Sequence, residues 1–88
     1  MKQDAASIEV RANLGSRIRE IRESQGLSQY AFSAMVGLDR SYLIDVEYGR
    51  RNVSVDNLFK IAYGLDVSLS TLFEDVDSFI YAHVKLPE

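Results

Sequence analysis

Two groups of polar side chains in the middle of the chain have the chemistry to bind a nucleic acid. Arg50, Arg51 and Asn52 follow one another, and three such donors in a loop suit phosphate oxygens. Arg40 and Ser41 open a predicted short helix. An arginine at the first turn of a helix in a major groove can donate two hydrogen bonds to guanine, worth about 1–3 kcal/mol of base discrimination. These five residues are therefore candidate contacts to DNA.

Metal and catalytic chemistry find little support in the sequence. The chain has no cysteine and one histidine, His83, so disulfide and zinc sites are excluded and no cofactor is expected. A Ser/His/Asp triad would need a nucleophile elbow or a glycine-rich oxyanion loop, and the sequence has neither. His83 lies on an apolar tail, where a structural or exposed histidine is more common than a proton switch. We expect no enzyme.

The charge of the chain is divided unevenly along its length. The net charge of −3 argues against a nucleic-acid partner. Residues 10–60, however, hold eight Lys and Arg against six Asp and Glu, whereas residues 61–88 hold one base against five acids. DNA responds to the local field of the face that docks on it, and net charge is only a coarse guide to that field. The distribution therefore permits DNA binding.

Length and hydropathy limit the architecture. A chain of 88 residues forms at most one domain with a thin stability margin. Its first residues, MKQDAAS, are neither basic nor apolar as a targeting segment requires, and no apolar run approaches the roughly 18 residues of a membrane helix. We expect a cytoplasmic protein with no membrane association.

Apolar periodicity and capping residues predict five short helices. Val10, Leu14, Ile18 and Ile21 recur at the spacing of an amphipathic helix. The predicted helices span residues 9–24, 29–36, 40–48, 55–64 and 69–75. Their expected N-caps are Ser28, Asp39, Ser54 and Ser68, and the expected helix stops are Gly26, Gly37 and Gly49. The fold class is therefore all-α, a compact five-helix bundle.

The buried faces and the domain limits follow from the same pattern. In the helix at 29–36 we expect Phe32 to face inward with Ala31 or Met35, and in the helix at 55–64 we expect Val55 to do so. The remaining predicted core comprises Leu43, Val46, Leu58, Ile61, Leu65, Leu69 and Leu72. Residues 9–75 form the domain and residues 1–8 an extension. The apolar tail at 76–88, whose spacing predicts neither helix nor strand, is a possible dimerisation element.

Residues 28–52 have the spacing of a helix-turn-helix unit, with the turn built on Gly37. The segments IREIRESQGLSQ, VGLDRSYLIDVEYGRRN and VDNLFKIAYGLDVSLSTLF occur in the order typical of one family. Over about residues 13–74 the chain resembles the Cro and phage-repressor helix-turn-helix family, also called the XRE family. This resemblance implies a lambda-repressor-like domain. Residues 39–52 resemble the controller proteins of restriction–modification systems.

The resemblance also implies roles for individual residues. Gln29 would bind a phosphate, and Tyr42 the DNA backbone or a thymine methyl. Base contacts would come from Arg40, Ser41 and Asp45, phosphate contacts from Arg50, Arg51 and Asn52, and an internal ion pair from Arg22 and Glu47. A carboxylate facing DNA is repelled by phosphates unless it accepts from cytosine or pairs with an arginine. Both alternatives stay open for Asp45.

Two classes of function fit these observations. The first is a transcriptional regulator that binds double-stranded DNA as a homodimer on an inverted repeat, with no small-molecule ligand. The second is a protein-interaction module, of antitoxin or anti-repressor type, that keeps the fold with weak or no DNA binding. Asp45 and the apolar side chains Tyr30, Ile44 and Tyr48 favour the second. The charges along the helix at 9–24 are expected to be solvated surface and not a binding face.

Overall fold

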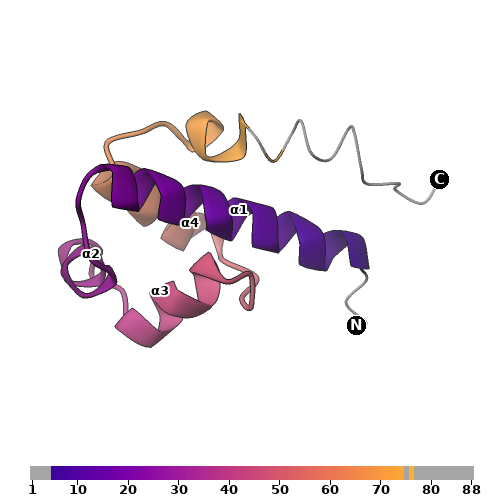
Figure 1. The fold of residues 1–88 in the computed structure, drawn as a ribbon, viewed down its shortest axis with the longest axis horizontal. Helices are drawn as coiled ribbons and strands as arrows, with labels where there is room; N and C mark the ends of the chain where they lie inside the picture. The colour runs from indigo at the N-terminus through magenta and orange to yellow at the C-terminus, as the bar shows by residue number, and fades with distance from the viewer. Residues whose placement is uncertain (1–4, 75, 77–88) are drawn as a thin grey trace.

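A computed structural model of the protein describes residues 5–74 and 76, which fold into helices joined by short turns (Figure 1). The helices are α1 (Ala5–Ser24), α2 (Gln29–Val36), α3 (Arg40–Glu47) and α4 (Val55–Gly64), followed by a short helix at residues 69–74. No strand occurs in this part of the chain. The predicted all-α fold of five helices is confirmed.

Serine side chains open three of the helices. Ser28 Oγ accepts from the Ala31 N–H at 3.0 Å, and Ser54 Oγ accepts from the Asn57 N–H at 3.1 Å. Ser68 Oγ accepts from the Thr71 N–H, also at 3.1 Å. Each hydroxyl satisfies an N–H group that has no partner inside its helix. These local signals explain why the predicted bounds of α2 and α4 are confirmed.

Two predictions about helix starts were right only in part. Asp39 is the N-cap residue of α3, as predicted, but its side chain makes no capping hydrogen bond. Asp39 is exposed, so water can solvate its carboxylate, and only its carbonyl joins α3, accepting from the Leu43 N–H at 3.0 Å. Helix α1 starts at Ala5, four residues before the predicted start. Ala5 and Ala6 are strong helix formers that carry no apolar period. Residues 5–8, predicted as part of an extension, therefore belong to α1.

All five helices contribute side chains to one core. Its fully buried large side chains are Ile18, Phe32, Leu43, Ile61, Leu65, Leu72 and Val76. Val55 and Leu69, which were predicted to face inward, are exposed instead, and so are both alternatives for α2, Ala31 and Met35. In a helix of eight to ten residues few positions can reach the core, and apolar character does not decide which ones do. Ser33 is buried in α2 instead, with its hydroxyl donating to the Tyr30 carbonyl.

Two glycines fix how α3 is held. Gly37, in the turn between α2 and α3, has a φ of +70°, a left-handed conformation that glycine adopts without strain. Gly15 of α1 lies against the end of α3, where an added Cβ would collide with the Val46 carbonyl and lie 2.6 Å from that of Glu47. Figure 1 shows α1 crossing the view, with α2 and α3 below it and residues 69–74 above it. Helix α3 is therefore clamped between α2 and α1.

The structure bears only in part on the predictions for the tail and for membrane association. The tail at 76–88, including His83, lies outside the described residues except for Val76, which is buried. Among the helices of residues 5–74, none combines the length and the apolar character needed to cross a membrane.

Candidate nucleic-acid interface

A buried ion pair joins α1 to α3. Arg22 Nε donates to Glu47 Oε2 at 2.6 Å and a terminal nitrogen of Arg22 donates to Glu47 Oε1 at 2.9 Å, so the contact is bidentate. The side chains are 6% and 0% exposed. Arg22 also donates to the Leu27 carbonyl at 2.6 Å, and Gln29 Nε2 donates to Glu47 Oε1 at 3.0 Å. The ion pair that the resemblance implies is therefore present. Together with Gln29, it connects the start of α2 and the end of α3 to α1.

The hydrogen bonds that Arg22 donates to Glu47 raise the pKa of Arg22 above its ordinary value, although burial acts in the opposite direction. An arginine side chain stays protonated in proteins, and the pairing with Glu47 favours its charged form further. Its charge is neutralised inside the protein and is not available to a ligand. Gln29, predicted to bind a phosphate, is half-buried and has its amide directed at Glu47.

Helix α3 presents its polar first turn to solvent. Arg40 and Ser41 are exposed, while Leu43 and Val46 point into the core. The Arg40 guanidinium carbon lies 5.9 Å from the centre of the Tyr30 ring on α2, within the range of a cation–π contact. The first turn of α3 is thus exposed and contacts α2 through Tyr30, while the opposite face of α3 is anchored in the core.

Asp45 is the centre of an exposed charge cluster. Arg50 Nε donates to Asp45 Oδ1 at 3.1 Å, and Arg51 Nε lies 3.6 Å from Asp45 Oδ2. The Arg50 and Arg51 side chains are 59% and 53% exposed. Of the two alternatives for Asp45, the structure contains the arginine pairing. The carboxylate that seemed unsuited to a DNA-facing surface is neutralised by the two arginines next to it.

Tyrosines lie under the same arginines. The Arg51 guanidinium carbon is 5.1 Å from the Tyr42 ring centre, and the Tyr42 hydroxyl accepts from Asn57 Nδ2 at 3.0 Å. The Arg50 guanidinium carbon is 5.2 Å from the Tyr48 ring centre. No role was predicted for Asn57 or for a Tyr48–arginine contact. For the tyrosine–arginine contacts, the available signal was the presence of two tyrosines and three arginines within residues 40–51.

The predicted DNA-contacting residues are concentrated in one part of the fold. Seven of the eight belong to α3 or to the loop that follows it: Arg40, Ser41, Tyr42, Asp45, Arg50, Arg51 and Asn52. Ion pairs and a cation–π contact link Asp45, Tyr42 and the two loop arginines into one cluster. Gln29 lies apart from this cluster at the start of α2, joined to α3 through Glu47.

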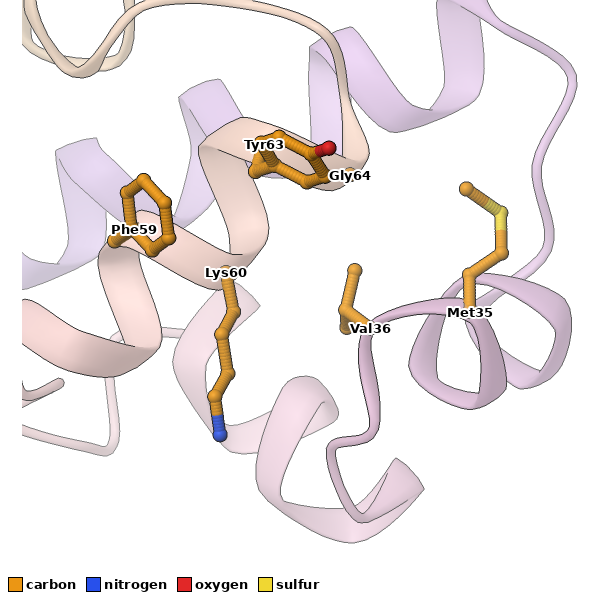
Figure 2. A pocket seen from close by; sticks show the side chains of 6 residues that line it. All are labelled: Met35, Val36, Phe59, Lys60, Tyr63 and Gly64. Atoms are coloured by element: carbon orange, nitrogen blue, oxygen red, sulfur yellow. The ribbon is translucent and has the colours of Figure 1, made fainter.

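A separate apolar groove of about 350 Å³ lies between α2 and α4 (Figure 2). Its side chains come from the end of α2 and from α4: Met35, Val36, Phe59, Lys60, Tyr63 and Gly64. Phe59 and Tyr63 are 57% and 78% exposed, and their ring centres are 6.0 Å apart. This surface was not predicted, because apolar side chains such as Met35 were expected to face inward.

Comparison with known families decides which kind of helical domain this is. The family described as Helix-turn-helix, HTH_3, matches residues 18–72. The chain belongs to this helix-turn-helix family. The match includes α2, the turn at Gly37 and α3, together with the buried Arg22–Glu47 pair. The XRE-type resemblance drawn from the sequence is confirmed.

Relatives of this helix-turn-helix protein are named as control proteins and transcriptional regulators. Control protein C.MunI from Mycoplasma sp is 41% identical over 70 residues, which are 78% of this chain and 95% of the relative. The restriction-modification controller protein C.AhdI from Aeromonas hydrophila is 47% identical, with a TM-score of 0.69 over 70% of this chain and 94% of that one. The resemblance to controller proteins is confirmed, and the chain is a helix-turn-helix transcriptional regulator.

A third relative has a structure with DNA. The tetramer of the controller protein C.Esp1396I in complex with its natural 35 base-pair operator has a TM-score of 0.71 to this chain at 29% identity. The likeness covers 82% of this chain and 95% of that one.

Proposed function

We propose that this regulator binds DNA sequence-specifically as a homodimer on an inverted-repeat operator, with α3 in the major groove. The observation that carries the proposal is the first turn of α3, where Arg40 and Ser41 are exposed while Leu43 and Val46 anchor the helix in the core. A helix held in this way can enter a groove without losing its packing. The operator complex of C.Esp1396I supports the same use of the fold.

In this proposal the polar residues have two tasks. Arg40, Ser41 and Asp45 face base edges, and phosphates are held by Gln29, Tyr42, Arg50, Arg51 and Asn52. Phosphate contacts fix the register of the protein on the duplex, whereas base contacts select the sequence. Asp45 can contribute to the two tasks in different ways. Its carboxylate orients the two phosphate-binding arginines and can also accept a hydrogen bond from cytosine N4.

Dimerisation follows from the size of the reading surface. One short helix contacts too few base pairs for useful specificity, and two copies about 34 Å apart on one face of the duplex multiply it. We assign the contact between copies to the helix at residues 69–74 and to the apolar tail at 76–88. The exposed fraction of Leu69, 38%, supports an apolar contact at this helix.

The decisive experiment is a gel shift with DNA from upstream of the protein's own gene, over a range of salt concentrations. Release of counterions makes specific binding fall steeply with salt. Replacing Arg40 with alanine should lower specific affinity by about 1–3 kcal/mol and relax the preference at one base position. Circular dichroism serves as the control for folding. Binding that does not depend on salt, or an unchanged affinity in Arg40→Ala, contradicts the proposal.

The apolar groove between α2 and α4 favours a second candidate, a protein-interaction module. In that case the wild-type protein has negligible affinity for DNA, and Arg40→Ala changes nothing. The same gel shift therefore separates the two functions.

A further inference from the structure

The arginines of α1 differ in what surrounds them. Arg11 donates to the Ser7 carbonyl of its own helix at 3.3 Å, and Arg17 lies 3.7 Å from both Glu20 and Glu74. Arg19 lies instead against another part of the fold, with its guanidinium carbon 5.5 Å from the centre of the Tyr48 ring. Within residues 5–74 and 76, no carboxylate lies at ion-pair distance from Arg19.

The same ring contacts an arginine of the loop after α3. The guanidinium carbon of Arg50 lies 5.2 Å from the centre of Tyr48, so one tyrosine is shared by cations from two elements. We propose that Arg19 and Tyr48 extend the phosphate-binding surface of this loop onto α1, so that Arg19 binds a DNA phosphate beside the one that Arg50 binds. This inference rests on the proposed function, and it assigns to one charge of α1 a role that the sequence analysis did not.

The electrostatics of the shared ring favour an anion. The face of an aromatic ring attracts a cation, but two guanidinium groups beside one ring repel each other. Asp45 offsets the charge of Arg50, whereas the charge of Arg19 has no such partner among the described residues. Tyr48 is 54% exposed, so a ligand can reach the arginines beside it. A phosphate oxygen there would gain from both cations and relieve their repulsion.

The backbone holds Arg19 at a fixed position relative to α3. Four residues before it, Gly15 packs against the carbonyls of Val46 and Glu47. Three residues after it, Arg22 is locked to Glu47 by two hydrogen bonds. This part of α1 therefore cannot shift along α3 without breaking one of these contacts. The Arg19 side chain is placed next to the loop before DNA arrives, which lowers the entropy lost on binding.

The test compares two arginines of the same helix in the full chain. Arg19→Gln and Arg11→Gln remove the same charge, but only the first touches Tyr48. Binding is measured between 50 and 200 mM salt on the upstream duplex and on a scrambled duplex of equal length. Loss of one phosphate contact makes the log–log salt slope shallower by about 0.9, so the ratio of wild-type to variant affinity is about threefold larger at 50 mM than at 200 mM.

We expect this change for Arg19→Gln on both duplexes and no change of slope for Arg11→Gln. Equal losses in the two variants would overturn the inference, because Arg19 would then act only through net charge. Failure of the proposed function looks different, since the wild-type protein itself would not prefer the upstream duplex.

Two substitutions of Tyr48 test the shared ring. Tyr48→Phe keeps the aromatic face and removes the hydroxyl, whereas Tyr48→Leu keeps apolar volume and removes the face. Binding like that of the wild type in Tyr48→Phe, and a loss in Tyr48→Leu that matches that of Arg19→Gln, supports the stacking. Equal losses in both variants would overturn it and assign the contact to the hydroxyl. Thermal melting confirms that each variant is folded.

Discussion

Helix α3 carries two carboxylates, Asp45 and Glu47, that both pair with arginines but in opposite surroundings. Glu47 and Arg22 are almost fully buried and share two short hydrogen bonds, and Glu47 accepts a third from Gln29. Asp45 lies at the surface, where Arg50 and Arg51 are more than half exposed and the contacts are longer. Both clusters pair a carboxylate with arginine, but they differ in the access of water and in the length of the contacts.

Burial therefore decides what each cluster can do. A buried pair must stay paired, because a lone charge without water is costly, so Arg22 and Glu47 serve the fold. An exposed pair contributes little to stability, since water and salt screen it, so its arginines can exchange a carboxylate for a phosphate. The positive charges available to DNA are those that the fold does not need.

The sharpest test of this contrast breaks the buried cluster. Glu47→Ala leaves the Arg22 guanidinium buried without its partner, and we expect the free energy of unfolding to fall by about 3–5 kcal/mol. Urea denaturation or thermal melting measures the loss. The control is Glu23→Ala, since Glu23 lies 4.0 Å from the same arginine but is 64% exposed. A loss no larger than that of the control would contradict a structural role for the pair.

A double variant distinguishes the contribution of the buried charges to stability from that of side-chain packing. Arg22→Met combined with Glu47→Leu replaces both charges with apolar side chains of similar length, so neither is left alone. We expect the double variant to be more stable than Glu47→Ala but to remain less stable than the wild type by about 1–3 kcal/mol, because Gln29 loses its acceptor. Denaturation of the single and double variants under one set of conditions gives the answer. A double variant as unstable as Glu47→Ala would show that the charges themselves are required.

The smallest effect is expected in the exposed cluster. Asp45→Asn removes the carboxylate that Arg50 and Arg51 share, and the free energy of unfolding should change by no more than about 1 kcal/mol. Affinity for a scrambled duplex should rise, because one negative charge is lost from the surface that we propose faces DNA. Denaturation and a gel shift measure the two quantities. A stability loss as large as that of Glu47→Ala would remove the distinction between the clusters.

Local signals in the sequence predicted much of the fold. The serine caps and the turn at Gly37 involve residues within a few positions of one another, and the bounds of α2 and α4 agreed with them. The inward faces of short helices were harder, because Met35 and Val55 are apolar yet exposed. Which face of a helix is buried depends on neighbours that are distant in sequence.

In the candidate site, too, local features could be predicted from the sequence and contacts between distant residues could not. The exposure of Arg40 and Ser41 followed from their place at the start of α3. The contact between Arg19 and Tyr48 could not be predicted, since it joins α1 to the end of α3 and leaves no periodic trace in the sequence. The pairing of Asp45 with arginines was one of two alternatives, and only coordinates could choose between them.

The close approach at Gly15 has a consequence for recognition. A single methyl group there would push α1 away from the end of α3. In the proposed complex α3 contacts the bases and Arg19 binds a phosphate outside the groove. Such a shift would leave both α3 and Arg19 intact, but the distance between them would no longer allow both to contact the same duplex. The alignment of α3 with Arg19 therefore depends on the absence of a side chain at Gly15.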